Sequence, residues 1–358
     1  MQVRYYGTEQ TISRPTGGAR HQNKKNLLDG LCIERNMRSS TLSWLCRVLT
    51  CGAALLLCAA TAYPQASPIP HGTLELIARH PWISPGQTLD LGLRFQLDKG
   101  WHIYWVNPGD SGEPPSIEWQ LPAGLTAGAI EWPTPKRFES GSIVDYGYED
   151  AVLLIVPLQA AASLPTQPPI RIDAKVKLLV CSHEMCVPGK TELTLTLPIK
   201  SPPMLHVHNN VVRKQDVENE HLFAATSQSL PRPAPGGWRF NVADTSDLFV
   251  LSVNFGSEIA GREVTQAIFF PLSESQIENA APQKLQPTTT GFRLTLRKSE
   301  RLLKPIARLQ GVIVFSADHS DSTHPDSNQS YIIDVPISKS SAARSSSIKI
   351  HPAEASQP

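Results

Sequence analysis

The residues best suited to chemistry are Cys181 and Cys186, which stand in the segment VCSHEMCVPG with four residues between them. Cysteines at this spacing can form a structural bridge, exchange disulfides with other proteins, or bind a soft metal. A bridge that closes so small a loop contributes only about 2 kcal/mol to folding, and bridges near solvent are easily reduced. The pattern therefore favours redox exchange, while a structural bridge and a metal site stay open.

The residues around the pair fit a reactive thiol moderately well. Lys175, Lys177 and Lys190 would favour a thiolate, whereas Glu184 would oppose it. His183 lies between the cysteines and could carry a proton near neutral pH. The alternative for His183 is an ordinary solvated residue of a loop.

The same segment offers a set of soft ligands. Cys181, His183, Met185 and Cys186 together could bind Cu(I), because thiolate and thioether sulfurs select that ion. A structural zinc site usually needs four protein ligands, and no second cysteine pair follows in the chain. We therefore expect no cofactor beyond the redox-active disulfide itself and keep copper binding as the alternative.

Four further residues are weaker candidates. Tyr146 and Tyr148 in YGYED could line the cysteine site, although core tyrosines would show the same pattern. Asp110 and Glu113 could assist proton transfer, but aspartate in NPGD is also a common turn residue.

Composition and patterning predict an all-β protein. The chain has 358 residues, 31 prolines, 22 glycines and a net charge of +1, which gives no reason to expect nucleic-acid binding. Alternating strand-like segments separated by turn residues fill residues 70–200 and resume over 238–338, which predicts two immunoglobulin-like β-sandwich domains. The expected strands are 73–80, 89–97, 102–106, 116–121, 151–159, 170–180 and 191–199, then 238–242, 248–255, 266–272, 291–298, 311–317 and 330–337. Four tryptophans are expected in the first core: Trp101, Trp105, Trp119 and Trp132.

The remaining segments predict connections and ends. Residues 201–237 form a linker, Pro-rich at both ends, with one helical candidate at 211–230, and 339–358 are expected to be a disordered tail. Residues 37–66 carry Arg38, a short apolar run and small residues at Ala60 and Ala62, which indicates a secretory signal peptide, with an uncleaved membrane-associated segment as the alternative. We expect residues 1–36 to be a mis-annotated extension that precedes the true start at Met37. Cleavage would leave an exported protein with two cysteines in an oxidising compartment, and the family resemblance given next implies that this compartment is the periplasm.

Several motifs in order resemble a known family. GWHIYWVNPGDSGEPPSIEWQLPAG (100–124), EWPTPKRF (131–138), YGYED (146–150) and LLVCSHEMCVPGKTELTLTLP (178–198) resemble the N-terminal periplasmic domain of DsbD-type thiol:disulfide interchange proteins. The resemblance is closest to the branch of the copper-tolerance-associated ScsB proteins. It covers residues 70–200, and 205–338 resemble the second β-domain that follows in that branch.

The resemblance implies a function and partners. Cys181 and Cys186 would be the redox pair, and electrons would arrive from a thioredoxin-like donor and pass to periplasmic proteins that carry disulfides. The printed chain has no counterpart of the family's transmembrane and thioredoxin-like domains, so we expect a separately encoded transmembrane DsbD-like partner. Which cysteine attacks is not decided by the sequence.

Overall fold

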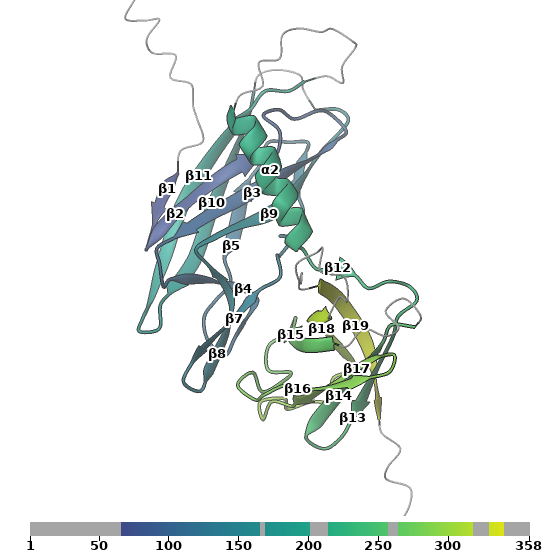
Figure 1. The fold of residues 1–358 in the computed structure, drawn as a ribbon. Coiled ribbons are helices and arrows are strands. Elements are labelled where there is room, and N and C mark those ends of the chain that lie inside the picture. The colour runs from purple at the N-terminus through teal and green to yellow at the C-terminus, as the bar shows by residue number, and fades with distance from the viewer. Residues whose placement is uncertain (1–65, 165–168, 201–213, 257–263, 318–328, 340–358) are drawn as a thin grey trace, which may run out of the picture. The chain divides into compact units, whose positions relative to one another are not determined.

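The computed structural model describes residues 66–164, 169–200, 214–256, 264–317 and 329–339 (Figure 1). The expected signal peptide, the 1–36 extension, most of the 339–358 tail and residues 201–213 of the linker lie outside these ranges. Among the described residues, no helix is both long enough and apolar enough to cross a membrane.

The described residues of 66–200 form two sheets, and this part of the chain is called the first domain below. One has the strand order β1-β2-β3-β9-β6 and the other β11-β10-β4-β8-β7, with β5 paired to β10 beside the end of β4. The strands of the first sheet are β1 Ser67–Ile69, β2 Gly72–Ala78, β3 Thr88–Leu97, β9 Ala151–Ala160 and β6 Leu125–Ala127. Those of the second are β11 Cys186–Leu197, β10 Ile170–Cys181, β4 His102–Gly109, β8 Ile143–Glu149, β7 Lys136–Ser140 and β5 Ser116–Gln120.

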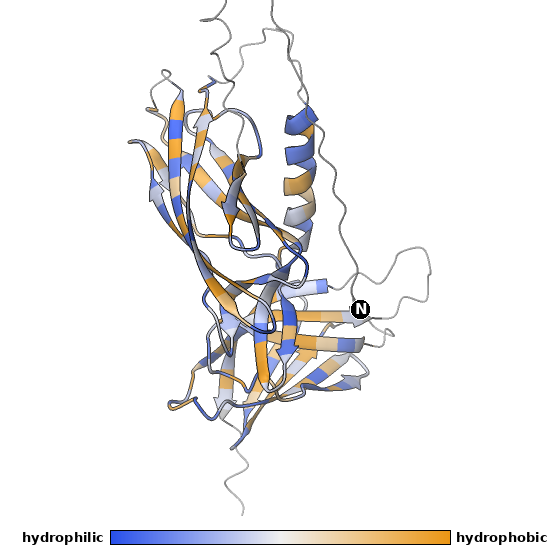
Figure 2. Ribbon diagram, turned by 90° about the vertical axis from the view of Figure 1, so that its left-hand side faces the viewer, coloured by the Kyte–Doolittle hydropathy of each residue, from blue (hydrophilic) through white to orange (hydrophobic). Residues whose placement is uncertain are grey.

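Alternation of side chains builds the core of this domain. Buried and more exposed residues alternate along most of β10, and hydrophobic and hydrophilic residues alternate along the strands in Figure 2. The buried members, among them Phe95, Trp105 and Val180, form one cluster that draws on both sheets. Trp101, Trp119 and Trp132 pack against that cluster, so the expectation for the four tryptophans is confirmed.

The one described helix, α2 Lys214–Ser229, packs on the first domain. Its Phe223 is fully buried against Ile77, Leu153 and Ile155. The side-chain amide of Asn219 donates to the backbone carbonyl of Ala78 at 3.1 Å. The helix predicted at 211–230 is therefore present, and it covers the outer face of the β2-β3-β9 sheet.

The described residues from Arg232 onwards form a single curled sheet, and this part of the chain is called the second domain below. Its order is β15-β18-β19-β13-β14-β17-β16, with β12 beside β19, and β15 also packs on β16 and β17. Its core includes Trp238, Phe255, Phe292 and Phe315. The strands are β12 Arg232–Pro233, β13 Arg239–Asp244, β14 Leu248–Asn254, β15 Val264–Pro271, β16 Lys284–Thr288, β17 Gly291–Arg297, β18 Arg308–Ala317 and β19 Gln329–Lys339.

The structure confirms the predicted all-β class and adds strands that the pattern did not predict. In the first domain these include β7 and β8, which form a hairpin across Gly141, a glycine with φ +63°. The second addition is the start of β11, which begins at Cys186 rather than near residue 191. Both additions lie at the site described next.

Candidate functional site

The two cysteines close a hairpin between β10 and β11. Cys181 ends β10, Cys186 begins β11, and the two are paired directly opposite each other with a disulfide between them. The turn is fixed by Ser182, whose backbone N–H donates to the Met185 carbonyl at 2.8 Å. Its hydroxyl oxygen accepts from the N–H groups of Glu184 and Met185 at 3.2 and 3.3 Å. Local backbone structure therefore places the sulfurs, independently of the bond between them.

The two sulfur-bearing residues differ in accessibility. Cys181 is 1% exposed, whereas Cys186 is exposed at the hairpin end. Met185 beside it is 56% exposed, which is unusual for a large apolar side chain. An incoming thiolate attacks a disulfide sulfur along the line of the bond, so Cys186 is the residue that a partner can reach.

The cysteines belong to one row of side chains across the second sheet. Glu149 of β8 pairs with His102 of β4, His102 pairs with Cys181, and Cys181 pairs with Cys186. Directly opposite residues project from the same face, with Cβ atoms about 4.5–5.5 Å apart. Ile103 and Val180 belong to the core cluster, so their neighbours His102 and Cys181 project from the other face. We call this the cysteine face.

Tyr104 supplies a hydroxyl at the disulfide. Two residues along β4 from His102, it lies on the cysteine face, is fully buried, and has its Oη 3.8 Å from Sγ of Cys186. Burial, reinforced by the charge of Asp145, raises the pKa of Tyr104 to about 12, against an opposing hydrogen bond with Ser111. The hydroxyl therefore stays protonated through the neutral range and can donate to sulfur.

The loop after β4 holds Tyr104 in place. The backbone N–H and hydroxyl of Ser111 donate to Oδ1 of Asp145 at 3.0 and 2.9 Å. Gly112 follows with φ +87°, and a Cβ added there would overlap the Tyr104 ring. The tyrosine ring therefore lies directly against a backbone position that only glycine leaves open.

His102 is the second buried polar residue on the cysteine face. It is 8% exposed, stacks on Phe138 with ring centroids 4.7 Å apart, and meets Tyr104 edge-on at 5.2 Å. Its Nε2 has no hydrogen-bond partner among the described residues. Burial first, then the charge of His183, lower its pKa to about 4, although Glu149 acts in the opposite direction. The imidazole is therefore neutral at pH 7.

Replacing Tyr104 by phenylalanine is expected to make the Cys186 thiol harder to ionise. The hydroxyl is a donor to a thiolate, and donors to the charged form lower a pKa. A hydrogen bond to a charged group contributes about 1.5–3 kcal/mol. Because the distance from the hydroxyl to the sulfur is long, we expect the smaller effect, a rise of about one unit in the pKa of the Cys186 thiol. Alkylation rates of Cys186 against pH, measured in a Cys181→Ser background, would report it. An unchanged profile would contradict the contact.

Of the sequence-predicted residues, the structure brings the two cysteines together and places His183 and Met185 in the exposed turn between them. Tyr146 and Tyr148 lie elsewhere, in the core cluster behind the sheet. The Tyr146 hydroxyl donates to Oδ1 of Asn279 at 2.9 Å, and that of Tyr148 donates to the Pro133 carbonyl at 2.7 Å. Burial raises both pKa values. These contacts do not fit the expectation that the tyrosines line the cysteine site.

Asp110 and Glu113 lie in the loop that follows β4. Asp110 accepts from the backbone N–H of Val144 and from the side-chain amide of Asn279, both at 2.8 Å, so each of its carboxylate oxygens already has a hydrogen-bond donor. Glu113 is exposed in the same loop. Proton transfer by either one stays a prediction that none of these contacts supports.

Sequence reasoning missed His102, Tyr104 and Phe138. Strand alternation could have found the first two, since His102 and Tyr104 are the polar-tipped positions of HIYWV and alternate with core residues Ile103 and Trp105. Nothing in the local pattern indicated that β4 would meet the cysteine end of β10, because the two strands are far apart in the chain.

Metal ligation finds little support in this geometry. Among the described ranges there is no group of three or more His, Cys, Asp or Glu side chains poised for a metal. Both sulfurs are bonded to each other, so neither is a thiolate ligand in this state. The copper alternative on Cys181, His183, Met185 and Cys186 therefore stays a prediction for the reduced protein.

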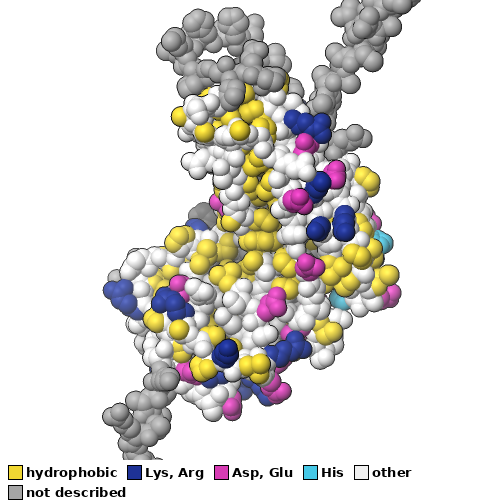
Figure 3. Space-filling model, turned by 180° about the vertical axis from the view of Figure 1, so that it is seen from behind, with side chains coloured by type: hydrophobic (Ala, Val, Ile, Leu, Met, Phe, Trp, Pro, Cys, Tyr) yellow, Lys and Arg dark blue, Asp and Glu magenta, His cyan; other side chains and the backbone are white. Residues whose placement is uncertain are grey.

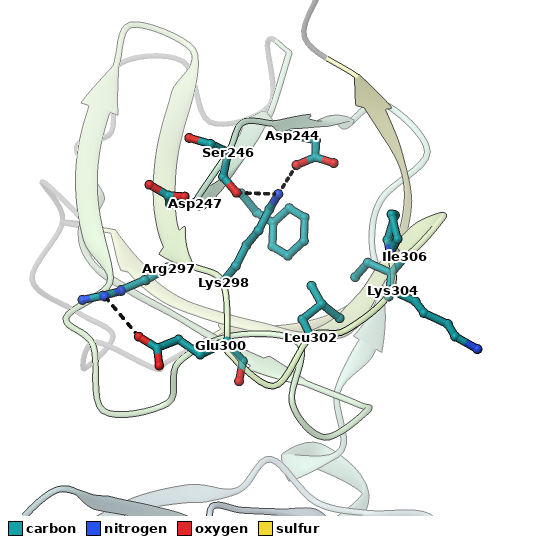
Figure 4. A pocket seen from close by; sticks show the side chains of 12 residues that line it. Asp244, Ser246, Asp247, Arg297, Lys298, Glu300, Leu302, Lys304 and Ile306 are labelled. Carbon is teal, nitrogen blue, oxygen red and sulfur yellow. Dashed lines mark hydrogen bonds and ion pairs between the residues drawn. The ribbon is translucent and has the colours of Figure 1, made fainter.

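On the face drawn in Figure 3, cationic and anionic side chains are interspersed with hydrophobic ones over the described residues. A cavity of about 360 Å³ lies within the second domain around Lys298, which contacts Asp244 and lies over the Phe249 ring (Figure 4). None of its lining residues belongs to the cysteine hairpin.

The fold and site together define an all-β domain that presents a disulfide at the end of a hairpin. Residues 75–198 match the family model described as thiol:disulfide interchange protein DsbD, N-terminal, which confirms the predicted resemblance for this segment. Among curated proteins, none matches the chain.

A solved structure agrees with this chain at the level of the fold. The N-terminal periplasmic domain of ScsB from Proteus mirabilis is similar over 76% of this chain and 98% of its own, with 15% identity and a TM-score of 0.51. Two others are a protein of unknown function from Porphyromonas gingivalis W83 and the Escherichia coli adhesin FdeC. They cover 74% and 76% of this chain and 99% and 66% of their own, at 10% and 9% identity. Their TM-scores of 0.19 and 0.18 are too low to indicate a shared fold.

Proposed function

We propose that this chain is an exported thiol:disulfide interchange module that relays reducing equivalents to periplasmic protein disulfides through Cys181 and Cys186. The observation that carries the proposal is the asymmetry of the bridge, with Cys186 exposed at the hairpin end and Cys181 1% exposed behind it. One accessible sulfur and one protected sulfur suit a mechanism with a single attack site and an internal resolving thiol.

The relay has two half-reactions. A donor thiolate attacks Sγ of Cys186, the Cys181–Cys186 bond breaks, and the Cys181 sulfur leaves with the electron pair and takes a proton. The donor's second thiolate then attacks the donor sulfur that is bonded to Cys186 in the mixed disulfide. This step releases Cys186 as a thiolate and leaves the donor oxidised. Two electrons have entered the pair.

Delivery runs through the same sulfur. The Cys186 thiolate attacks one sulfur of a substrate disulfide and displaces the other as a thiolate. The Cys181 sulfur, after losing its proton, attacks Sγ of Cys186 and displaces the first substrate sulfur. The substrate gains two electrons and two protons, and the intramolecular bridge is restored.

The partners follow from the family that residues 75–198 match. DsbD-family N-terminal domains exchange electrons with thioredoxin-like proteins and membrane-embedded partners. The similar ScsB domain is described as periplasmic. We therefore propose a thioredoxin-like donor, which draws its electrons from a membrane-embedded protein, and substrates in the periplasm.

A redox titration tests this function. Equilibration of the folded protein with glutathione buffers should give a potential well above about −300 mV, because structural bridges lie below that value. Reduced thioredoxin should open the bridge within minutes without denaturant. A bridge that resists thioredoxin in the folded state, with a lower potential, would contradict the proposal and leave a binding module with a structural disulfide. Stoichiometric Cu(I) binding that Cys181→Ser abolishes would favour the copper alternative.

A further inference from the structure

We infer that His102 is the group that takes the proton from Cys181 when the disulfide closes and returns it when the disulfide opens. The inference rests on the proposed exchange function and assigns a proton path to the buried half of the pair. Cys186 can trade protons with water because it is exposed, whereas Cys181 is 1% exposed. A thiol that must ionise while buried needs a neighbouring acceptor.

Position singles out His102 for this role. It pairs directly with Cys181 in the β4–β10 register, on the side of Cys181 opposite to Cys186. Paired residues on one face bring their side chains within reach of each other. The Nε2 atom is buried without a hydrogen-bond partner among the described residues, and a buried polar atom left unpaired requires an explanation. A proton or a thiol that arrives in the reduced state would supply the missing partner.

The packing holds the ring in that position. Phe138 of β7 stacks on one face of the imidazole, and Tyr104, which lies on β4 like His102, meets it edge-on. An imidazole fixed between two aromatic rings keeps its nitrogens aimed at one place, which proton transfer requires.

The charged groups around the ring set its titration. Glu149 of β8 is paired with His102 and favours the imidazolium, but Lys136 of β7 binds Glu149 at 2.7 Å. His183 from the hairpin disfavours the imidazolium, as does burial, which is the largest cause of the lowered pKa. With the bridge closed, the ring is therefore neutral and has room for a proton. When the bridge opens, a Cys181 thiolate beside the ring would favour the imidazolium and raise the pKa.

The proton balance of the closing step is complete. The Cys181 S–H bond breaks and its proton moves to Nε2 of His102 while the Cys181 sulfur bonds to Sγ of Cys186. The Cys186–substrate bond breaks and the substrate leaves as a thiolate. The imidazolium then loses its proton to water, and the substrate thiolate takes one from water. Opening runs through the same steps in reverse.

A single-turnover experiment tests the assignment. The reduced wild-type protein and the reduced His102→Gln variant would each be mixed with oxidised glutathione. The reaction would be quenched with acid at successive times, and the products would be identified by intact-protein mass spectrometry. We expect wild type to pass quickly to the closed form. In His102→Gln the glutathione adduct on Cys186 should accumulate, with closure slowed about 100-fold at pH 7. The variant should approach the wild-type rate as the pH rises towards about 9, because hydroxide then removes the proton instead.

Two histidine controls sharpen the result. His80→Gln removes an exposed histidine that pairs with Glu220 on the first domain and should close at the wild-type rate. His183→Gln removes the exposed histidine of the hairpin. If His183→Gln slows closure as much as His102→Gln, or if the His102→Gln deficit does not change with pH, the assignment is wrong. A wild-type protein that forms no glutathione adduct and never closes would instead overturn the proposed function.

A measurement on wild type covers the case in which His102→Gln does not fold. The His102 imidazole would be titrated by NMR in the oxidised and the reduced protein. A pKa that rises by one unit or more on reduction supports the assignment. A pKa that stays the same in both redox states, in a protein that exchanges disulfides, would overturn it.

Discussion

Cys181→Ser is expected to convert the protein into a trap, and Cys186→Ser is expected to abolish exchange. In the first variant the exposed Cys186 still attacks a partner disulfide, but no second thiol resolves the adduct, so a mixed disulfide persists. In the second, the remaining thiol at position 181 is 1% exposed and cannot reach a partner. Gel mobility under non-reducing conditions, after incubation with a disulfide-bearing protein, would measure both. The trapped fraction should differ by at least about 100-fold.

Comparison of these two variants also shows which cysteine attacks the partner disulfide, a question that the sequence left open. Both variants lose the same bridge, so its contribution to stability cancels in the comparison. Cys181→Ser also places a hydroxyl at a position that is 1% exposed, so its melting temperature should be the lower of the two. Adducts formed equally by both variants, or only by Cys186→Ser, would contradict the accessibility argument and the attack site derived from it.

Gly112→Ala is expected to destabilise the fold by about 2–5 kcal/mol and to disturb the disulfide. A methyl group there would overlap the fully buried Tyr104 ring, and overpacking of this kind costs about 1–3 kcal/mol. The residue also has φ +87°, which adds about 1–2 kcal/mol for a residue with a Cβ. Because the displaced ring carries the hydroxyl next to Cys186, the reaction rate of the reduced Cys186 should change as well. Urea unfolding and alkylation kinetics measure the two effects.

Gly100→Ala is the matched control. Gly100 has φ +84°, but a Cβ there meets nothing within 4 Å. The control therefore isolates the backbone cost and should lose only about 1–2 kcal/mol, with unchanged alkylation of Cys186. Equal destabilisation of the two variants would show that Gly112 is needed for its backbone conformation alone.

Strands in which apolar and polar residues alternate were predictable from the sequence, and strands without this alternation were missed. The alternation in IRIDAKVKLLV predicted a strand over 170–180, and the observed β10 ends one residue later, at Cys181. The start of β11 was missed because Val187, Pro188 and Gly189 read as a turn. Pro188 instead pairs with Leu179 on a strand that lies at the edge of its sheet, where a missing N–H is tolerated. The β7–β8 hairpin was missed because KRFESGSIVDYGYE mixes charged and apolar residues without a period of two.

The site was predictable only in its cysteines. Their identity and spacing are local, and so is the hairpin that joins them. The environment is set by pairings between residues distant in sequence, such as His102 with Cys181 and Tyr104 with Cys186. For Tyr146 and Tyr148 the sequence left a site-lining role and a core position open, and the structure places both in the core cluster, because the local sequence does not say which face of β8 meets the core. That choice depends on the partner sheet.

The long run of backbone pairs between β10 and β11 affects how fast the disulfide can close again. The strands pair continuously from Ile170 opposite Leu197 to Cys181 opposite Cys186, and Ser182 closes the turn. Cutting one sulfur–sulfur bond leaves those backbone pairs intact, so the separated thiols remain adjacent without any search. Effective molarities for such preorganised ring closures reach about 10⁵–10⁸ M. The wild-type protein should therefore act as a two-electron carrier of low reorganisation cost, with mixed disulfides too short-lived to accumulate.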